Sequence, residues 1–481
     1  MNIVSHSAAP RAWAEEHFGD TPFSDIRRVE RVVRIAEAMA VNPGASIPRL
    51  FAHSYDTKAA YTFFGQAEAE PDTIQAAHRA LVLEQMEAPG TYLLIEDTTE
   101  LDWTGRAPVE GLGPVGNSNT KTQGVILHSV LGVRWPAAVA PTPHERRPSV
   151  TVLGVCDQQY HIRVPRPGGE GRHDSQAKKK RERESQIWQW ASERIGPAPE
   201  TGRWVRVGDA AADIYEHLRA CLGMGHGYVI RSGQDRAVVG SDGRTPVGRL
   251  YETVRAAACL GGFPVEVSAR KGQPARTAQV SVSAVAVWLR SPQRPGAPVG
   301  KLPPVPCTAV RVWEESAPEQ GEALEWILLC DTPVQTFAQA RECALQYATR
   351  WLIEDYHKAL KTGLGAERLQ FEKASRLFAA VAIMSVVALR LVGLREQVRT
   401  TPEQPAETVG WTGVELQVLR ATSAKPLITV RDVALAIGRL GGHLNRKRDG
   451  LPGWQTLWQG MKKLALLVEG VRLAGKLQKF G

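Results

Sequence analysis

Apolar residues in the first ninety positions recur with the period of an α-helix. Val29 and Val33 lie on the apolar side of a stretch that begins after Ser24, a residue type that caps helix N-termini. An Asn-Pro-Gly segment ends this stretch, and Asp56 is placed to cap a later helix. We therefore predict an all-helical N-terminal domain over residues 1–88.

The pattern changes at residue 90 to short apolar runs that are typical of buried strands. The run at residues 92–95 ends at Asp97, and the run at residues 204–207 ends at Asp209. In open α/β sheets, functional sites form beyond the carboxyl ends of strands. An isolated aspartate there has an ordinary interpretation as well, because it can be a loop acid or a helix cap.

The remaining pattern divides the rest of the chain. Apolar and polar positions alternate over residues 236–325, which predicts a β-rich insertion. Helical periodicity then dominates to the end, interrupted by a polar, proline-containing linker. We predict an α/β core over residues 89–398, with the insertion inside it, and a C-terminal helical region over residues 399–481.

One predicted helix carries a row of polar residues. Its members have spacings of 3, 4, 4 and 3, which place them in one narrow stripe: Tyr347, Arg350, Glu354, Lys358 and Lys361. Leu345, Leu352 and Tyr356 fall on the opposite side. Periodicity alone also fits an ordinary amphipathic helix, whose solvent-exposed face is stabilised by Arg-to-Glu and Glu-to-Lys pairs four residues apart.

Three carboxylates on two strands and a helix suggest a specific chemistry. Carboxylate oxygens are the ligands that Mg²⁺ takes in proteins, and two ions ~3.5–4 Å apart can clamp both oxygens of an in-line displacement at phosphorus. The cations beside Glu354 would then hold DNA phosphates. Asp97, Asp209 and Glu354 are therefore our candidate ligands for two Mg²⁺ or Mn²⁺ ions.

Charge and composition are compatible with this hypothesis. The net charge is +9, from 59 Lys and Arg against 50 Asp and Glu, which suits an anionic partner. The six cysteines fit neither a zinc site nor a disulfide framework, so we expect a reduced, cytoplasmic chain. The apolar stretch at residues 377–389 is too short to span a bilayer, and we expect a buried helix and no membrane partner.

Three segments resemble one family of DNA-processing enzymes. They are YATRWLIEDYHKALKTG at residues 347–363, IEDTT at residues 95–99 and GDAAADI at residues 208–214. The first resembles the Y-(2)-R-(3)-E-(6)-K signature of the cut-and-paste DDE transposases of the insertion-sequence-four family, and the chain is similar to the transposase of bacterial transposon five. The order and separation of the segments also fit, including a β-rich insertion before the glutamate.

This resemblance implies a fold and a set of roles. It implies a ribonuclease-H-like core in which Asp97, Asp209 and Glu354 bind the metal ions, and a homodimer that pairs two transposon ends. The C-terminal segments at residues 454–458 and 461–468 resemble the dimer-forming helices. The residues that it implies for contact with transposon-end DNA are Tyr347, Arg350, Lys358, Lys361, Trp326, Arg231, Arg27 and Arg28. Among these, Trp326 would hold a flipped base, although a core aromatic beside a strand is the alternative.

The implied reaction is metal-dependent cleavage at the transposon ends followed by joining to target DNA. The resemblance implies a nick, a hairpin and its reopening before the joining step. Two alternatives remain: a catalytically silent DNA-binding regulator, and a ribonuclease-H-like nuclease that cuts without strand transfer. The chain departs from the family where alanines 210–212 follow Asp209 in place of charged residues.

Overall fold

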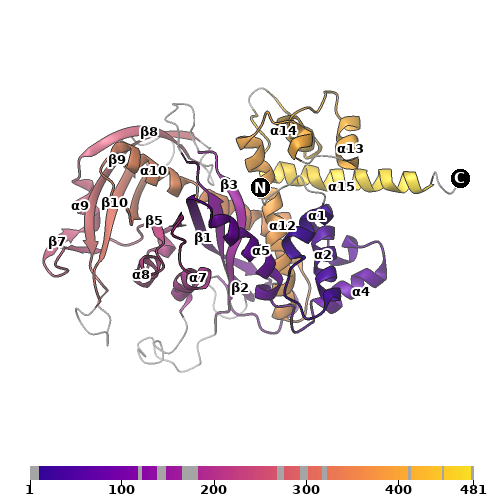
Figure 1. The fold of residues 1–481 in the computed structure, drawn as a ribbon, viewed down its shortest axis with the longest axis horizontal. Helices are drawn as coiled ribbons and strands as arrows, with labels where there is room; N and C mark the ends of the chain where they lie inside the picture. Colours follow the sequence, from indigo (N-terminus) through magenta and orange to yellow (C-terminus); the bar gives the residue numbers. More distant parts are fainter. Residues whose placement is uncertain are drawn as a thin grey trace.

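The computed structural model gives the fold of most of the chain (Figure 1). The residues that it describes are 10–116, 122–137, 148–164, 183–267, 276–292, 302–316, 322–409, 413–446 and 449–477. The fold is mixed α/β, with one large sheet, helices before it in the chain and helices after it. Figure 1 shows the sheet on one side of the molecule and the N- and C-terminal helices together on the other.

Eleven described strands form the sheet, in the order β3-β2-β1-β4-β5-β11-β10-β9-β6-β7, with β8 paired to β9. Their bounds are β1 Gly90–Asp102, β2 Gly124–Arg134, β3 Thr151–His161, β4 Gly202–Gly208, β5 Gly227–Arg231, β6 Ala237–Val239, β7 Pro246–Arg249, β8 Cys259–Val267, β9 Arg276–Leu289, β10 Val305–Trp313 and β11 Glu325–Cys330. Strands β1, β2 and β3 are antiparallel neighbours, whereas β1, β4 and β5 are parallel.

The parallel pairing of β1 with β4 fixes the positions of two predicted site residues. Ile95 lies opposite Val207 in this register. Asp97 and Asp209 each follow two residues later, so both strands deliver an aspartate to the same edge. The strand β1 does not end at Asp97 as predicted, because it continues to Asp102 through its antiparallel pairing with β2.

Residues 236–325, predicted as a β-rich insertion, contain the strands β6 to β10, which do not form a separate layer. Strands β9 and β10 pair with each other, and β10 pairs with β11, which in turn pairs with β5 of the core. The insertion therefore lengthens the core sheet, with the short helix α9 (Leu250–Arg255) packed on it.

Helices cover both faces of the sheet. Their bounds are α1 Pro10–Phe18, α2 Ile26–Val41, α3 Ile47–Leu50, α4 Ser54–Phe63, α5 Pro71–Met86, α7 Ile187–Ile195, α8 Tyr215–Gly223, α10 Phe337–Ala348, α11 Trp351–Lys358, α12 Ala374–Thr400, α13 Val414–Thr422, α14 Val430–Leu440 and α15 Trp454–Leu477, with a π-helical turn at Ala359–Gly363 and shorter 3-10 turns elsewhere. Helices α7 and α8 lie on the face of β1 that bears Leu94 and Glu96, and α10, α11 and α12 lie on the face that bears Leu93 and Ile95.

Helix α12 is the apolar helix that the sequence predicted to be buried. By length and composition it is the one described helix that could cross a membrane, but 89% of its most apolar window is buried inside the protein. It packs against α2, α5 and α15, so it links the N-terminal helices, the sheet and the C-terminal helices. The structure thus uses α12 as a core helix of the whole molecule.

Two predicted helix caps in the N-terminal region are wrong. Asp25, rather than Ser24, precedes α2, and its side chain accepts a hydrogen bond from the backbone N–H of Arg27. Helix α4 begins after His53, so Asp56 lies inside its first turn and is buried. Asp56 instead pairs with Arg31 and Arg34 of α2, a tertiary contact that local sequence does not reveal.

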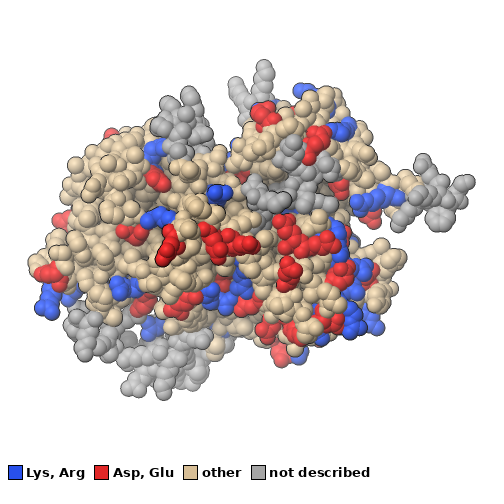
Figure 2. Space-filling view, viewed as in Figure 1, with Lys and Arg blue, Asp and Glu red and all other residues tan. Residues whose placement is uncertain are grey.

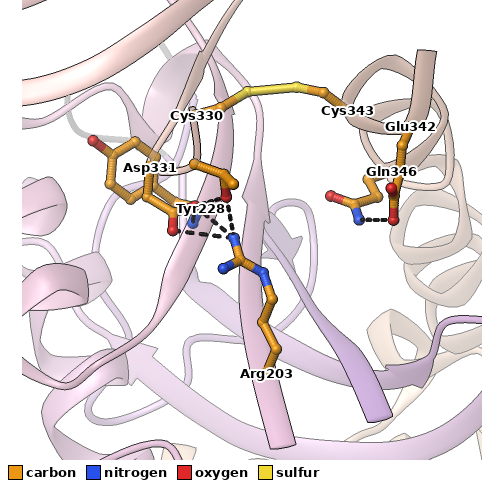
Figure 3. Close-up of a disulfide and its surroundings, with 8 residues drawn as sticks. Arg203, Tyr228, Cys330, Asp331, Glu342, Cys343 and Gln346 are labelled. Carbon is orange, nitrogen blue, oxygen red and sulfur yellow. Dashed lines mark hydrogen bonds and ion pairs between the residues drawn. A yellow bond between two sulfur atoms is a disulfide. The ribbon is translucent and has the colours of Figure 1, made fainter. Parts of the chain in front are cut away.

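The prediction of a chain without disulfides is also wrong. Cys330, at the end of β11, is bonded to Cys343 in α10, and the other four cysteines are free (Figure 3). Sequence spacing did not indicate this pair because the two residues meet only where α10 packs on β11. Beside the bond, Asp331 accepts hydrogen bonds from Arg203 and from the backbone N–H of Tyr228, which ties β4, β5 and β11 together.

Candidate active site

Asp97 and Asp209 are held by backbone donors at the edge where β1 and β4 meet. One oxygen of Asp97 accepts a hydrogen bond from the N–H of Thr98 at 2.8 Å. One oxygen of Asp209 accepts from the N–H of Ala211 at 2.8 Å, so Asp209 does cap the short 3-10 turn at Ala210–Ala212. Each carboxylate keeps its second oxygen free of these backbone bonds.

The polar stripe spans two consecutive helices, α10 and α11, and the π-helical turn after them, not one continuous helix. Helix α10 ends at Ala348 and α11 begins at Trp351, so Arg350 lies at the junction. Leu345, Leu352 and Tyr356 are buried as predicted and anchor both helices. This packing leaves Glu354 on the first turn of α11, with about a quarter of its side chain exposed.

The guanidinium of Arg350 connects two of the three carboxylates. Its Nη1 donates to Oδ2 of Asp97 at 2.9 Å, and its Nη2 donates to Oε1 of Glu354. Only 11% of the Arg350 side chain is exposed, and 16% of that of Asp97. Ion pairs this sheltered from water are screened less than surface pairs, so the arginine holds the two acids firmly in place.

The pKa of Asp97 shows that all three carboxylates share one electrostatic environment. Burial raises this pKa to about 6, and the negative charges of Asp209 and Glu354 add to the rise, while Arg350 and the Thr98 N–H oppose it. Like charges disfavour ionisation of a neighbouring acid. The site therefore gathers more negative charge than Arg350 alone neutralises.

The carboxylates are not already arranged around an ion position. Within the described part of the chain, no group of three His, Cys, Asp or Glu side chains is gathered closely enough to hold a metal ion as it stands. Donor chemistry nevertheless fits a hard divalent cation, since carboxylate oxygens are its preferred ligands and the crowded charge on Asp97 calls for a counter-ion.

The two lysines of the stripe differ in their surroundings. Lys358 is exposed, with its ammonium 5.9 Å from the ring centre of Trp351. Lys361 lies in the π-helical turn, donates to the backbone carbonyl of Glu100 at 2.6 Å and pairs with Glu367 at 3.1 Å. Lys358 is therefore the freer of the two to meet a phosphate.

Three further candidates meet beside the acids from three different elements. The ring of Trp326 in β11 packs edge-on against Tyr347 of α10, with centroids 5.0 Å apart. Tyr347 is buried rather than presented to solvent, and burial raises its pKa, opposed by Arg350 and by a hydrogen bond to Arg231 at the end of β5. Trp326, Tyr347 and Arg231 thus form one group next to Asp209.

The N-terminal candidates lie far along the chain from this group, at the start of α2. Arg27 is 88% exposed and pairs with Asp25, and Arg28 pairs with Glu68. Arg31 and Arg34 share Asp56, as described above, so part of the predicted basic face is neutralised within the protein. Arg27 is left as the most accessible of these cations.

Sequence reasoning missed a charged cluster on the opposite face of β1. Glu96, Arg206 and His217 are fully buried, and Glu96 accepts from Arg206 and lies 2.9 Å from His217. Burial opposes charge on Glu96, but Arg206 and His217 outweigh it and hold its pKa at about 2. The sequence could have indicated this cluster, because an arginine inside the apolar run of β4 requires a buried partner.

Basic side chains also line a cavity away from the acids. This cavity, of about 670 Å³, lies between the α2–α3 turn, the segment after α11 and helix α15, and its cationic lining residues are Arg49, Arg368 and Lys462. Figure 2 shows acidic and basic side chains interspersed on one face of the molecule, with a row of acidic ones across its middle. On this face, the described acidic side chains thus offset part of the positive charge.

Two family models match the ends of the chain. Residues 10–69, which include α1 to α4, match a transposase DNA-binding model. Residues 386–481, from the second half of α12 to the C-terminus, match the dimerisation domain of the Tn5 transposase. Together these matches support a transposase that binds DNA and dimerises, and more particularly a Tn5-like transposase.

Proposed function

We propose that this chain is a cut-and-paste DNA transposase of the DDE type, with Asp97, Asp209 and Glu354 as its catalytic carboxylates. One observation carries the proposal: the register of β1 and β4 brings the two aspartates together, and Arg350 ties Glu354 to Asp97. Membership of the insertion-sequence-four family is part of the same proposal, supported by the signature at residues 347–361.

The topology supports a ribonuclease-H-like core. Three antiparallel strands, β3-β2-β1, continue into two parallel strands, β4 and β5, and the carboxylates come from β1, from the end of β4 and from a later helix. We place the domain boundaries at residues 1–88, 89–398 and 399–481, with the insertion at residues 236–325. The matches at residues 10–69 and 386–481 support a DNA-binding part near the N-terminal end and a dimerising part near the C-terminal end.

The three carboxylates would hold two Mg²⁺ or Mn²⁺ ions. Bound divalent ions would activate the attacking hydroxyl and neutralise charge on the leaving oxygen of the DNA phosphate. The protein's own groups then have to bind and orient the DNA, so that water attacks at the transposon end and a freed 3′-hydroxyl attacks next. We propose a nick, a hairpin, its reopening and joining to target DNA.

The residues around the acids are suited to hold the DNA. Lys358 and Lys361 extend from α11 and the following turn on the side of Glu354, where they would meet phosphates. Trp326 has the half-buried ring needed to stack on a base that leaves the duplex, a contact worth ~1–3 kcal/mol per base. Tyr347 and Arg231, hydrogen-bonded to each other, would orient that base and its phosphate.

A cleavage and joining assay tests the proposed function. The full chain is incubated with a duplex carrying the element's own terminal sequence, Mg²⁺ and a supercoiled target plasmid. We expect nicked ends followed by a joined product, and no product from Asp97→Ala or from Glu354→Gln, which keeps the side-chain shape.

The two alternative functions give different results in the same assay. Binding without nicking, at a level equal to that of Asp97→Ala, would identify a DNA-binding regulator. Cleaved ends that are never joined to the plasmid would identify a nuclease without strand transfer. A cytoplasmic location with access to the bacterial chromosome goes with the transposase proposal.

A further inference from the structure

Arg350 occupies the position between acids that the proposed function assigns to metal ions. The same guanidinium donates to Oδ2 of Asp97 and to Oε1 of Glu354. These oxygens would have to face a divalent cation. A guanidinium and a divalent cation repel each other at contact distance, so full occupation of the site by both is disfavoured.

The surroundings of Arg350 offer it a second position. It lies at the junction of α10 and α11, and its guanidinium carbon is 5.9 Å from the ring centre of Trp351. The ammonium of Lys358 lies the same distance from that ring. A DNA phosphate that reaches Lys358 along α11 would therefore come close to Arg350, and planar guanidinium groups bind phosphate through two parallel hydrogen bonds.

We propose that Arg350 is an internal counter-ion, which holds Asp97 and Glu354 in the metal-free protein and leaves them for a DNA phosphate when the ions bind. This inference rests on the proposed function, because it assumes that these acids are the metal ligands. Arg350 is a positioning residue in this role, since it acts on the carboxylates and not on the reacting bond.

The exchange couples two binding events. If DNA draws Arg350 away from the carboxylates, DNA tightens metal binding, and by thermodynamic reciprocity the metal tightens DNA binding. The free protein would then bind ions weakly and would hold them firmly only on DNA. This explains why the described carboxylates are not gathered around an ion position while Arg350 bridges two of them.

Mn²⁺ binding to the full chain, measured by the electron paramagnetic resonance of the free ion, tests the proposal without any need for activity. In the absence of DNA, we expect Arg350→Ala to bind Mn²⁺ about tenfold more tightly than the natural chain. Arg350→Lys, which keeps the charge but cannot bridge two carboxylates with one planar group, should lie between them. Lys358→Ala is the matched control, because it removes a nearby positive charge that contacts neither acid, and its Mn²⁺ affinity should stay within about twofold.

A second arm adds a duplex of the element's terminal sequence. The Mn²⁺ affinity of the natural chain should rise on DNA, and that of Arg350→Ala should change much less. An unchanged or weaker Mn²⁺ affinity for Arg350→Ala without DNA would overturn the inference, as would an equal gain in Arg350→Ala and Lys358→Ala.

The same titrations separate this inference from the proposed function. If Asp97→Ala, Asp209→Ala and Glu354→Ala all bind Mn²⁺ like the natural chain, the metal site itself is wrong and the proposed function fails. If those variants lose Mn²⁺ binding while Arg350→Ala gains none, the metal site stands and only the role of Arg350 fails. Circular dichroism of each variant shows whether its fold is intact.

Discussion

Asp97 is held in surroundings that disfavour its own charge. Its pKa in the folded protein is about 6, raised from 3.8 by burial and by Asp209. Folding therefore takes up a proton between about pH 4 and pH 6, and stability falls as the pH rises through this interval. Above pH 6, the ionised Asp97 lowers the free energy of unfolding by its full amount. The rise in pKa sets this amount at roughly 3 kcal/mol at most.

Replacement of this acid should stabilise the metal-free protein. We expect Asp97→Asn to increase the free energy of unfolding by roughly 1–3 kcal/mol at pH 7.5, and the gain should vanish near pH 4. Urea denaturation with a chelator present measures it. Asp102→Asn, at the exposed end of the same strand, is the control and should change stability by less than about 0.5 kcal/mol. A lower stability of Asp97→Asn at pH 7.5 would show that the ion pair of Asp97 with Arg350 outweighs burial and the repulsion from Asp209.

The buried ion pair of Glu96 and Arg206, by contrast, should stabilise the fold, so its loss should lower the free energy of unfolding. Arg206→Met leaves Glu96 charged and fully buried, with His217 at 2.9 Å and His128 at 3.7 Å beside it. Loss of one partner of a buried ion pair costs about 3–5 kcal/mol, measured here by urea denaturation at pH 7.5. Arg203→Met, in the same strand, removes a pair in which the arginine is 45% exposed and should cost about 1 kcal/mol or less.

A double variant tests the cause of that loss. Glu96→Gln combined with Arg206→Met removes both charges, so it should recover a large part of the stability lost in Arg206→Met. Additive losses in the double variant would contradict the assignment and point to packing alone. The result also bears on function, because Glu96 and Arg206 join the two strands that carry Asp97 and Asp209.

At the scale of elements, sequence periodicity predicted the strands and helices better than it predicted their ends and partners. The apolar runs of β1 and β4 and the helix α2 were recognisable because local pattern decides them. The extension of β1 to Asp102 and the Cys330–Cys343 bond depend on contacts with segments that are not adjacent in sequence.

The candidate site, too, could be predicted only in part from the sequence. The spacing placed Leu352 and Tyr356 on the side of the helix opposite Glu354, and both are buried. Spacing did not predict that Arg350 would bridge Asp97 and Glu354, nor that Tyr347 would be buried against Trp326. Both contacts require the three-dimensional position of α10 on the sheet.

Helix α15 has two apolar faces, and among the described residues one is buried and the other is exposed. Leu457, Leu464 and Val468 are buried against the other C-terminal helices. Leu466 and Leu473, seven residues apart and so on one face, are 62% and 53% exposed. Exposed apolar stripes of this kind mark protein interfaces, and the stripe falls inside the matched dimerisation model.

Charges on the exposed stripe should weaken dimerisation without loss of the fold. We expect Leu466→Glu with Leu473→Glu to raise the dimer dissociation constant by about thirtyfold or more, as for truncation of an interface hot spot. Sedimentation with a duplex of the terminal sequence measures this constant. Gln417→Glu adds a charge of the same sign at an exposed position of α13, away from the stripe, and serves as the control. Equal dimerisation of both variants would place the interface elsewhere.

At the scale of the whole molecule, one sheet and one helix join parts that differ in function. The sheet runs from β3 through the aspartate-bearing strands to the insertion, and α12 contacts the N-terminal helices, the sheet and α15. The helix α2, inside the match to the DNA-binding model, and α15, inside the match to the dimerisation model, thus both pack on the helix that contacts the sheet. The net charge of +9 acts on the same scale, because DNA binding by phosphate contacts depends on the number of cations that reach the backbone.

The salt dependence of DNA binding therefore tests whether α2 contacts phosphates. Each phosphate contact contributes about −0.9 to the slope of log K against log salt concentration, so Arg27→Ala should weaken binding and make the slope less steep by about 1. Fluorescence anisotropy over a series of NaCl concentrations measures it. Asp25→Asn is the matched variant, and it should have the opposite effect. Asparagine can still cap α2, but it does not form an ion pair with Arg27, so DNA binding should tighten. Arg34, which shares Asp56 with Arg31, should give a smaller change when replaced by alanine. An unchanged slope for Arg27→Ala together with unchanged affinity for Asp25→Asn would remove the start of α2 from the DNA-binding surface.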